Sequence, residues 1–242
     1  MMQQMFLGYG ASVEFKNEYE TYGETGRFNS YTSYGTVTEN DTGYTLPSNA
    51  WDYYGGKVRE LDTGGFKIIT NNSATTEFFM GCWVKFESYA QSKQMGLNLS
   101  GNYIYWETVG NSGAIGIRHS GGGRTDSSNT SVDDGNWHHI ALSRSGSQLF
   151  GFLDGSTVVS TTSGVSGNSV SDNAQFWFFG GSGTSYNIDG QIIDPFVYIG
   201  QGLDSNYTLP ASPLISATAQ VNELFGISNS SYLYYASPGV AL

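Results

Sequence analysis

The stretch NWHHIALSRSGSQLFGFLDG, residues 136–155, decides the fold class because it reads as a β-hairpin followed by a second turn. Residues 137–144 and 148–153 are strand-forming runs separated by a short Ser-Gly-Ser sequence. Asp154 and Gly155 then give a strong hairpin-turn signal. The stretch therefore predicts antiparallel strands, and it holds no catalytic group with an evident partner.

The most strongly predicted strand precedes this hairpin, at residues 77–86. Both of its faces are largely apolar, as in a strand buried inside a sandwich. One face carries Phe78, Met80, Cys82, Val84 and Phe86, and the other carries Phe79, Gly81, Trp83 and Lys85.

Further strands are predicted on both sides. Residues 57–61 and 66–70 read as a hairpin around the sequence Asp-Thr-Gly-Gly. Pro195 interrupts the last run and favours an edge strand or a bulge there. No amphipathic helix with caps, domain linker or fixed-period repeat is evident in the sequence. The remaining predicted strands cover residues 95–99, 103–108, 114–119, 157–161, 175–179 and 188–199.

The composition of the 242 residues excludes several classes of protein. Glycine occurs 33 times and only 13% of residues are charged, which is typical of short strands joined by many turns. The formal net charge of −11 argues against nucleic acid and anionic membranes as partners. Cys82 is the only cysteine, so no intramolecular disulfide can form. No apolar run reaches the ~18 residues that a membrane helix needs, and the first residues do not resemble a signal peptide.

An ordered set of segments resembles the laminin-G-like, concanavalin A-like jelly rolls. The segments are FFMGCWVKF (78–86), NWHHIAL (136–142), FGFLDG (150–155), FWFFGG (176–181), IDGQIIDPFVY (188–198) and YTLP (207–210). The resemblance implies an all-β fold, an antiparallel β-sandwich over residues 1–213. Residues 214–242 are then an extension that packs on this domain or on a neighbouring subunit. The fold hosts lectins, glycosidases, adhesion modules and viral shell proteins, so it does not by itself define a function.

Two positions depart from the family pattern. Gly81 stands where many relatives have glutamate, and Pro195 stands where relatives usually have a second acid after Asp194. The second departure weakens an acidic metal site. The structural core is predicted to include Trp83, Trp137, Trp177 and Phe152.

Candidate chemical groups are scattered in the sequence. His138 and His139 are neighbours on a strand, so they point to opposite faces and cannot share one ligand or metal. The Glu-x-Asp-x-x-Glu arrangement of jelly-roll glucanases is absent, and Asp133-Asp134, the best candidate for calcium, is interpreted as solvated surface. No catalytic residue, metal site or cofactor is therefore predicted.

Aromatic side chains supply the candidate binding residues. Tyr53 and Tyr54 are possible glycan contacts because tyrosine stacks on sugars, although packing in the core or at its rim also explains them. The apolar C-terminal extension is predicted to contact another subunit, or else to fold back as an extra edge strand. Its candidate interface residues are Leu224, Phe225, Tyr232, Tyr234 and Tyr235.

The resemblance also suggests a setting, since chains of this kind without a signal peptide are similar to virion proteins of tailed bacteriophages. The first hypothesis is a non-enzymatic virion structural protein, a capsid decoration or cement protein or a tail-associated protein. It would be made in the host cytoplasm and would bind other virion proteins or copies of itself. The alternative is a carbohydrate-binding, lectin-like adhesion module that recognises host glycans. A glycoside-active enzyme is the third hypothesis.

Overall fold

The computed structural model describes residues 19–22, 28–40, 58–70, 77–88, 97–100, 104–109, 114–118, 124–127, 132, 134–163, 165, 175–179, 188–209 and 233–236. The regular elements within these ranges are strands, all paired in antiparallel fashion. This part of the chain contains no helix long and apolar enough to cross a membrane.

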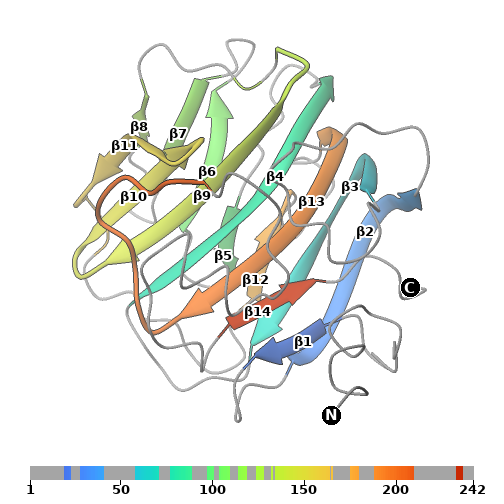
Figure 1. The fold of residues 1–242 in the computed structure, drawn as a ribbon, viewed down its shortest axis with the longest axis horizontal. Helices are drawn as coiled ribbons and strands as arrows, with labels where there is room; N and C mark the ends of the chain where they lie inside the picture. The colour runs from blue at the N-terminus through green and yellow to red at the C-terminus, as the bar shows by residue number, and fades with distance from the viewer. Residues whose placement is uncertain are drawn as a thin grey trace, which may run out of the picture.

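The strands form two layers, which we call the front sheet and the back sheet (Figure 1). The front sheet has the order β11 (Ser156–Thr161), β10 (Gln148–Leu153), β9 (Trp137–Ser145), β4 (Phe78–Ser88), β13 (Ile188–Ile199) and the first half of β3 (Val58–Thr70). The back sheet continues from the second half of β3 through β12 (Gln175–Phe178), β5 (Leu97–Ser100), β6 (Ile104–Val109), β7 (Ala114–Arg118) and β8 (Arg124–Asp126). The predicted all-β sandwich is confirmed.

Strand β3 joins the two sheets, which corrects one prediction. The sequence indicated a hairpin turning at residues 62–65, but β3 runs without interruption through this stretch. Its first half pairs with β13 and its second half, from Phe66 to Ile69, pairs with β12. Strand β2 (Phe28–Asn40) follows β3 along its length, with a register shift opposite the same stretch. The glycines at 64 and 65 thus lie where a strand passes from one sheet to the other, a place where glycine is common.

The core lies between the sheets. Phe78 of β4 and Phe176 of β12 meet edge to face, with ring centroids 5.6 Å apart, and both are fully buried. Strand β7 of the back sheet lies against β10 and β11. The even-numbered residues of β4 face this core, so its odd-numbered residues lie on the outer face of the front sheet.

The 136–155 stretch forms the predicted turns. Gly146 has a φ of +57° and follows Ser145, which pairs with Gln148 in a two-residue hairpin. Asp154 and Gly155 have φ values of +49° and +82°, the pair of positive angles that a type I′ turn requires. Local turn chemistry therefore fixes the register of β9, β10 and β11.

Pro195 lies at a bulge, as its sequence context suggested. The pairing of β13 with β4 shifts register between Ile193 and Phe196, so residues 194 and 195 are outside the regular ladder. The bulge lets a proline occupy a strand that is paired on both sides, because no ladder hydrogen bond is needed from its nitrogen.

After β13 the chain crosses the outer face of the front sheet, in front of β9 and β10 (Figure 1). We call residues 200–209 the covering segment. Its backbone is tied at several points: Gly200 donates to the Glu77 carbonyl (2.9 Å), Leu203 donates to Ser143 Oγ (2.7 Å), and Tyr207 donates to the Gly155 carbonyl (2.9 Å). The side chain of Asn206 accepts a hydrogen bond from the Thr157 amide (2.8 Å).

The last strand, β14 (Leu233–Ala236), belongs to the chain's own sheet. It pairs with the second half of β13 at residues 196–198 and with β1 (Tyr19–Tyr22). This part of the C-terminal extension is therefore an added strand beside β13.

Candidate functional site

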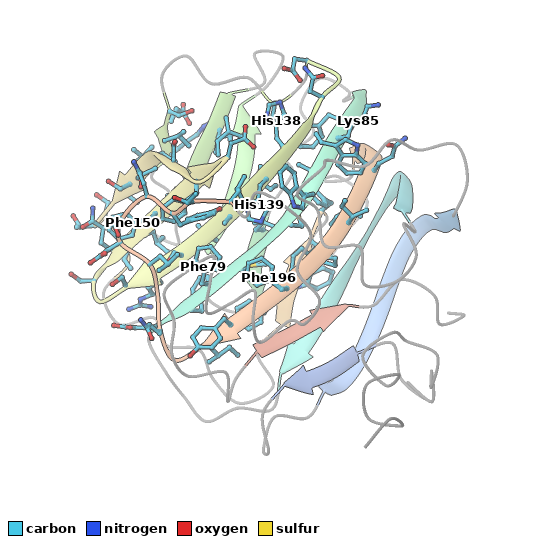
Figure 2. The ribbon with its side chains drawn as sticks, viewed as in Figure 1. Phe79, Lys85, His138, His139, Phe150 and Phe196 are labelled. Carbon is cyan, nitrogen blue, oxygen red and sulfur yellow. The ribbon has the colours of Figure 1, made fainter. Side chains whose placement is uncertain are left out.

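Two adjacent histidines and their hydrogen-bond partners lie near the beginning of β9. Neighbouring residues of a strand face opposite sides, and β9 accordingly sends His138 and His139 to different partners (Figure 2). His138 is partly buried near the end of the sandwich, whereas His139 is 1% exposed beneath the covering segment.

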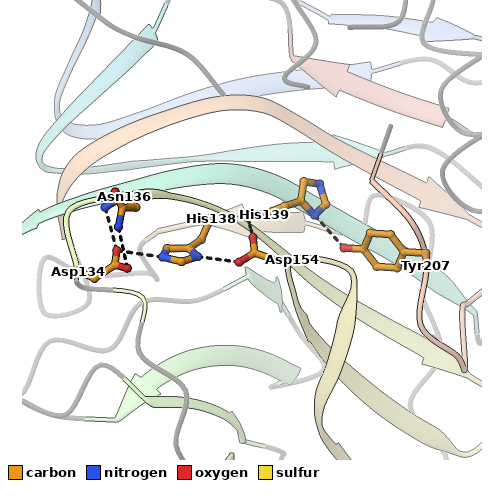
Figure 3. Close-up of polar contacts among 6 residues, drawn as sticks. All are labelled: Asp134, Asn136, His138, His139, Asp154 and Tyr207. Carbon is orange, nitrogen blue, oxygen red and sulfur yellow. Dashed lines mark hydrogen bonds and ion pairs between the residues drawn. The ribbon is translucent and has the colours of Figure 1, made fainter. Parts of the chain in front are cut away.

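His138 is held between two carboxylates (Figure 3). It donates through Nδ1 to Asp154 Oδ2 (2.8 Å) and through Nε2 to Asp134 Oδ1 (3.0 Å). Asp154 comes from the β10–β11 turn and Asp134 from the loop before β9. The hydrogen bond to Asp154, with a smaller contribution from Asp134, raises the pKa of His138 above its usual value against the opposing effect of burial. Carboxylate oxygens beside both ring nitrogens favour the imidazolium form of His138, in which both nitrogens donate.

Each carboxylate also accepts backbone hydrogen bonds. Asp154 Oδ1 accepts from the His139 amide (2.8 Å), which ties the turn to β9. Asp134 accepts from the amide and the side chain of Asn136, at 2.8 and 2.9 Å. These bonds, the Asn136 side chain first, lower the pKa of Asp134 to about 2. The cluster therefore fixes the loop before β9 against the β10–β11 turn.

His139 lies in an aromatic environment. Its Nδ1 shares a 2.8 Å hydrogen bond with the Tyr207 hydroxyl, while Phe196 stacks on its ring at 6.3 Å and Trp83 meets it edge to face at 5.3 Å. Burial lowers the pKa of His139 to about 3 and raises that of Tyr207 well above its usual value. Both groups are therefore neutral at physiological pH.

The outer face of β4 has no room for the glutamate that the family resemblance suggests at position 81. A Cβ atom on Gly81 would lie 2.9 Å from the Ile140 carbonyl oxygen and 3.2 Å from Cε1 of Phe196. Such contacts are too short for a side chain unless the neighbours shift. The Phe196 ring thus occupies the side of the sheet on which an acid would project.

The predicted core residues are placed as follows. Phe152 is fully buried, but it packs against Phe79 and Tyr207 on the outer face of the front sheet, and Trp177 is 4% exposed. Trp83 is also 4% exposed, but it packs with Ile193 in a second cluster on the outer face of the front sheet. Trp137 is only half-buried, because it is the first residue of β9 and packs at the margin of that second cluster.

The predicted binding residues are only partly described. Tyr53, Tyr54, Leu224, Phe225 and Tyr232 lie outside the described residues. Tyr234 and Tyr235 belong to β14, whose backbone pairs with β13 and β1. Among the described residues, no group of three His, Cys, Asp or Glu side chains could hold a metal ion.

The sequence interpretation missed the partners of the two histidines. It placed Asp154 in a turn, Asp134 in a solvated loop and Tyr207 in a closing family motif. Asp154 is 16 residues from His138, and Tyr207 is 68 residues from His139. Only the paired histidines before an Asp-Gly turn signalled that polar groups could meet here.

Comparison with known proteins identifies the superfamily. The sequence model described as the concanavalin A-like lectin/glucanases superfamily matches residues 61–199. No curated protein sequence matches the chain significantly.

Several solved structures are similar in fold. Domain 4 of AbnA, a GH43 extracellular arabinanase from Geobacillus stearothermophilus in complex with arabinotriose, aligns with 18% identity over 73% of this chain and 85% of that chain, with a TM-score of 0.51. A heptameric SAP-like pentraxin from Limulus polyphemus aligns with 14% identity over 70% of this chain and 83% of that chain, with a TM-score of 0.44. A structure of botulinum neurotoxin type C, whose cell entry depends on two ganglioside molecules, aligns with 14% identity over 72% of this chain and 44% of that chain, with a TM-score of 0.47.

Proposed function

The chain belongs to the concanavalin A-like lectin/glucanases superfamily, and we propose that it is a non-catalytic binding domain of that superfamily. The observation that carries this proposal is the packing at Gly81. Phe196 and the β9 backbone fill the space beside it, on the outer face of β4 where many relatives have an acid. We expect a domain that has no room for that acid to act by presenting its surface.

The carboxylates around His138 support the same conclusion. A glycosidase of the usual kind needs one carboxylic acid that is protonated near neutral pH and a second carboxylate across the bond to be cleaved. Asp134 has a pKa of about 2, so it is ionised and cannot donate a proton to a leaving group. Asp154 accepts hydrogen bonds from His138 and from the His139 amide. Both carboxylates are thus used to hold the loop and the turn together.

Within this class, a virion structural protein of a tailed phage is the role that we favour. The chain would decorate or cement the capsid, or attach to the tail, by surface complementarity with other virion proteins or with copies of itself. The charge of −11 suits docking on a basic neighbour and disfavours packing against nucleic acid. This role predicts that the protein is found in purified particles of its source, detected by mass spectrometry. Particles that lack it would exclude this role.

Carbohydrate recognition is the second candidate. It is favoured by the superfamily and by the fold shared with the arabinanase domain, which was solved with arabinotriose. Under this alternative the chain is an adhesion module for host glycans. Saturable binding on a glycan array would support it, and the absence of binding across the array would exclude it.

A hydrolysis assay tests the non-catalytic proposal directly. The full chain is incubated with β-glucans and arabinans, and the release of reducing ends is measured. We expect no release above the buffer rate from the wild type or from Asp154→Asn. Hydrolysis by the wild type that disappears in Asp154→Asn or Asp134→Asn would overturn the proposal.

A further inference from the structure

Two buried ring nitrogens on the outer face of the front sheet have no hydrogen-bond partner among the residues that the structure describes. They are Nε1 of Trp83 and Nε2 of His139. The residues occupy directly paired positions of β4 and β9, and their ring centroids are 5.3 Å apart at an interplanar angle of 80°. The two unpaired polar atoms thus belong to neighbouring buried rings.

Leaving these atoms unpaired is costly. A buried donor or acceptor without a partner destabilises a protein by about 1–3 kcal/mol, and such atoms are rare. The indole N–H can only donate. His139 is neutral and shares its Nδ1 with the Tyr207 hydroxyl, so its Nε2 carries either a lone pair or a hydrogen that requires a partner.

A hydroxyl oxygen satisfies both groups in either tautomer of His139. It accepts a hydrogen bond from the Trp83 indole, and it donates to or accepts from His139 Nε2. One oxygen can bond to both nitrogens when they lie no more than about 6 Å apart, which is two ordinary hydrogen-bond distances. The ring centroids are 5.3 Å apart, so the two rings are neighbours, and one oxygen bridges them if the two nitrogens lie within that span.

The surroundings match the chemistry of a sugar ring. Trp83 and Ile193 are buried, whereas Trp137 and Leu209 pack against them and are half-buried. The half-buried pair lies on the side of the cluster that solvent reaches. Aromatic and aliphatic walls around a few convergent polar atoms are typical of small-molecule and carbohydrate sites.

We propose that Trp83 and His139 form a binding site for one hydroxyl oxygen, supplied by a carbohydrate that enters beside Trp137 and Leu209. The carbohydrate source rests on the second candidate function given above. A bound water has the same hydrogen-bonding chemistry, so the experiment separates the two.

The test follows the Trp83 indole N–H by NMR in the full-length, 15N-labelled protein, with its resonance identified by its loss in Trp83→Phe. We expect pentoses, hexoses and their oligosaccharides to shift this resonance saturably and to leave that of Trp177 unchanged. His139→Gln or His139→Phe should weaken the response about tenfold, as expected for one hydrogen bond. Trp177→Phe is the control and should bind as the wild type does.

Three other results would refute all or part of the proposal. A Trp83 indole that shows a cross-peak to bound water and no response to sugar would retain the hydroxyl site but refute the carbohydrate ligand. Sugar binding that shifts other resonances and leaves Trp83 unchanged would overturn the site while carbohydrate recognition survives. A Trp83 indole with neither a water cross-peak nor a sugar response would overturn the proposal.

Discussion

The adjacent histidines of β9 respond to pH in opposite directions because their surroundings differ. His138 is bonded to two carboxylates, which favour its charged form, whereas His139 is enclosed by aromatic rings, which favour its neutral form. A single strand therefore carries one histidine that stabilises the fold when protonated and one that destabilises it when protonated.

The pKa of His138 should exceed the ordinary value of 6.5 in an NMR titration of the imidazole signals. Asp154→Asn should lower it more than Asp134→Asn, because the hydrogen bond to Asp154 is the largest cause of the shift. Since the folded pKa is raised, the stabilisation is complete below 6.5 and is lost as pH rises through the folded value. Equal shifts in the two variants would contradict the assigned order of the partners.

His139 should make the protein sensitive to acid. Its pKa is about 3 in the folded chain and about 6.5 when unfolded, so the unfolded state takes up a proton first as pH falls. Stability should decrease by up to ~1.4 kcal/mol per pH unit between 6.5 and 3. Urea unfolding at several pH values measures this slope.

Two variants distinguish the contributions of His138 and His139 to this loss of stability in acid. His139→Phe should flatten the acid slope, even if its stability at neutral pH is lower. His138→Gln should keep the slope, because the buried histidine is intact. An unchanged acid slope in His139→Phe would show that other groups cause the loss of stability.

At the scale of elements, the covering segment depends on the β10–β11 turn. Tyr207 donates to the Gly155 carbonyl, and a Cβ atom on Gly155 would overlap the Tyr207 carbonyl oxygen. The turn and the segment approach so closely that only glycine fits between them.

Gly155→Ala should therefore destabilise the protein by roughly 3 kcal/mol or more, because the left-handed backbone is strained and the covering segment must move. Gly135 is a matched control: its φ is +79°, close to the +82° of Gly155, and a Cβ atom there meets nothing within 4 Å. Gly135→Ala should cost only the backbone strain, about 1 kcal/mol. Thermal unfolding compares the two, and equal losses would mean that the close approach contributes little.

At the scale of the whole molecule, the chain after β13 reinforces the front sheet in two places. The covering segment closes the face over β9 and β10, and β14 extends the ladder at the second half of β13. The buried aromatic face of the front sheet is thus sheltered in part by chain that follows the last strand of the sandwich.

Truncation after residue 214 should lower the midpoint of thermal unfolding, because residues 196–198 of β13 lose their pairing with β14 and β1 loses its partner strand. A truncated chain with the stability of the intact protein would indicate that this pairing contributes nothing. In that case the extension would be free to contact another subunit, as the sequence interpretation proposed for its apolar residues.

Sequence reasoning succeeded where structure depends on near neighbours. The turns at residues 145–147 and 154–155, the strands around them and the bulge at Pro195 follow from the conformations that glycine, aspartate and proline adopt. Alternation along β9 was enough to assign His138 and His139 to opposite faces.

The tertiary structure decided what depends on contacts between distant parts of the chain. The glycines at 64 and 65 suggested a turn, but pairing with β13 and β12 on one side keeps β3 continuous. The hydrogen-bond partners of the two histidines are Asp134, Asp154 and Tyr207. The hairpin register and the covering segment bring them to β9. The sequence by itself determined the strands and their turns, because those follow from local backbone preferences. The folded chain alone decided which side chains meet, because burial and hydrogen bonding act between residues far apart in sequence.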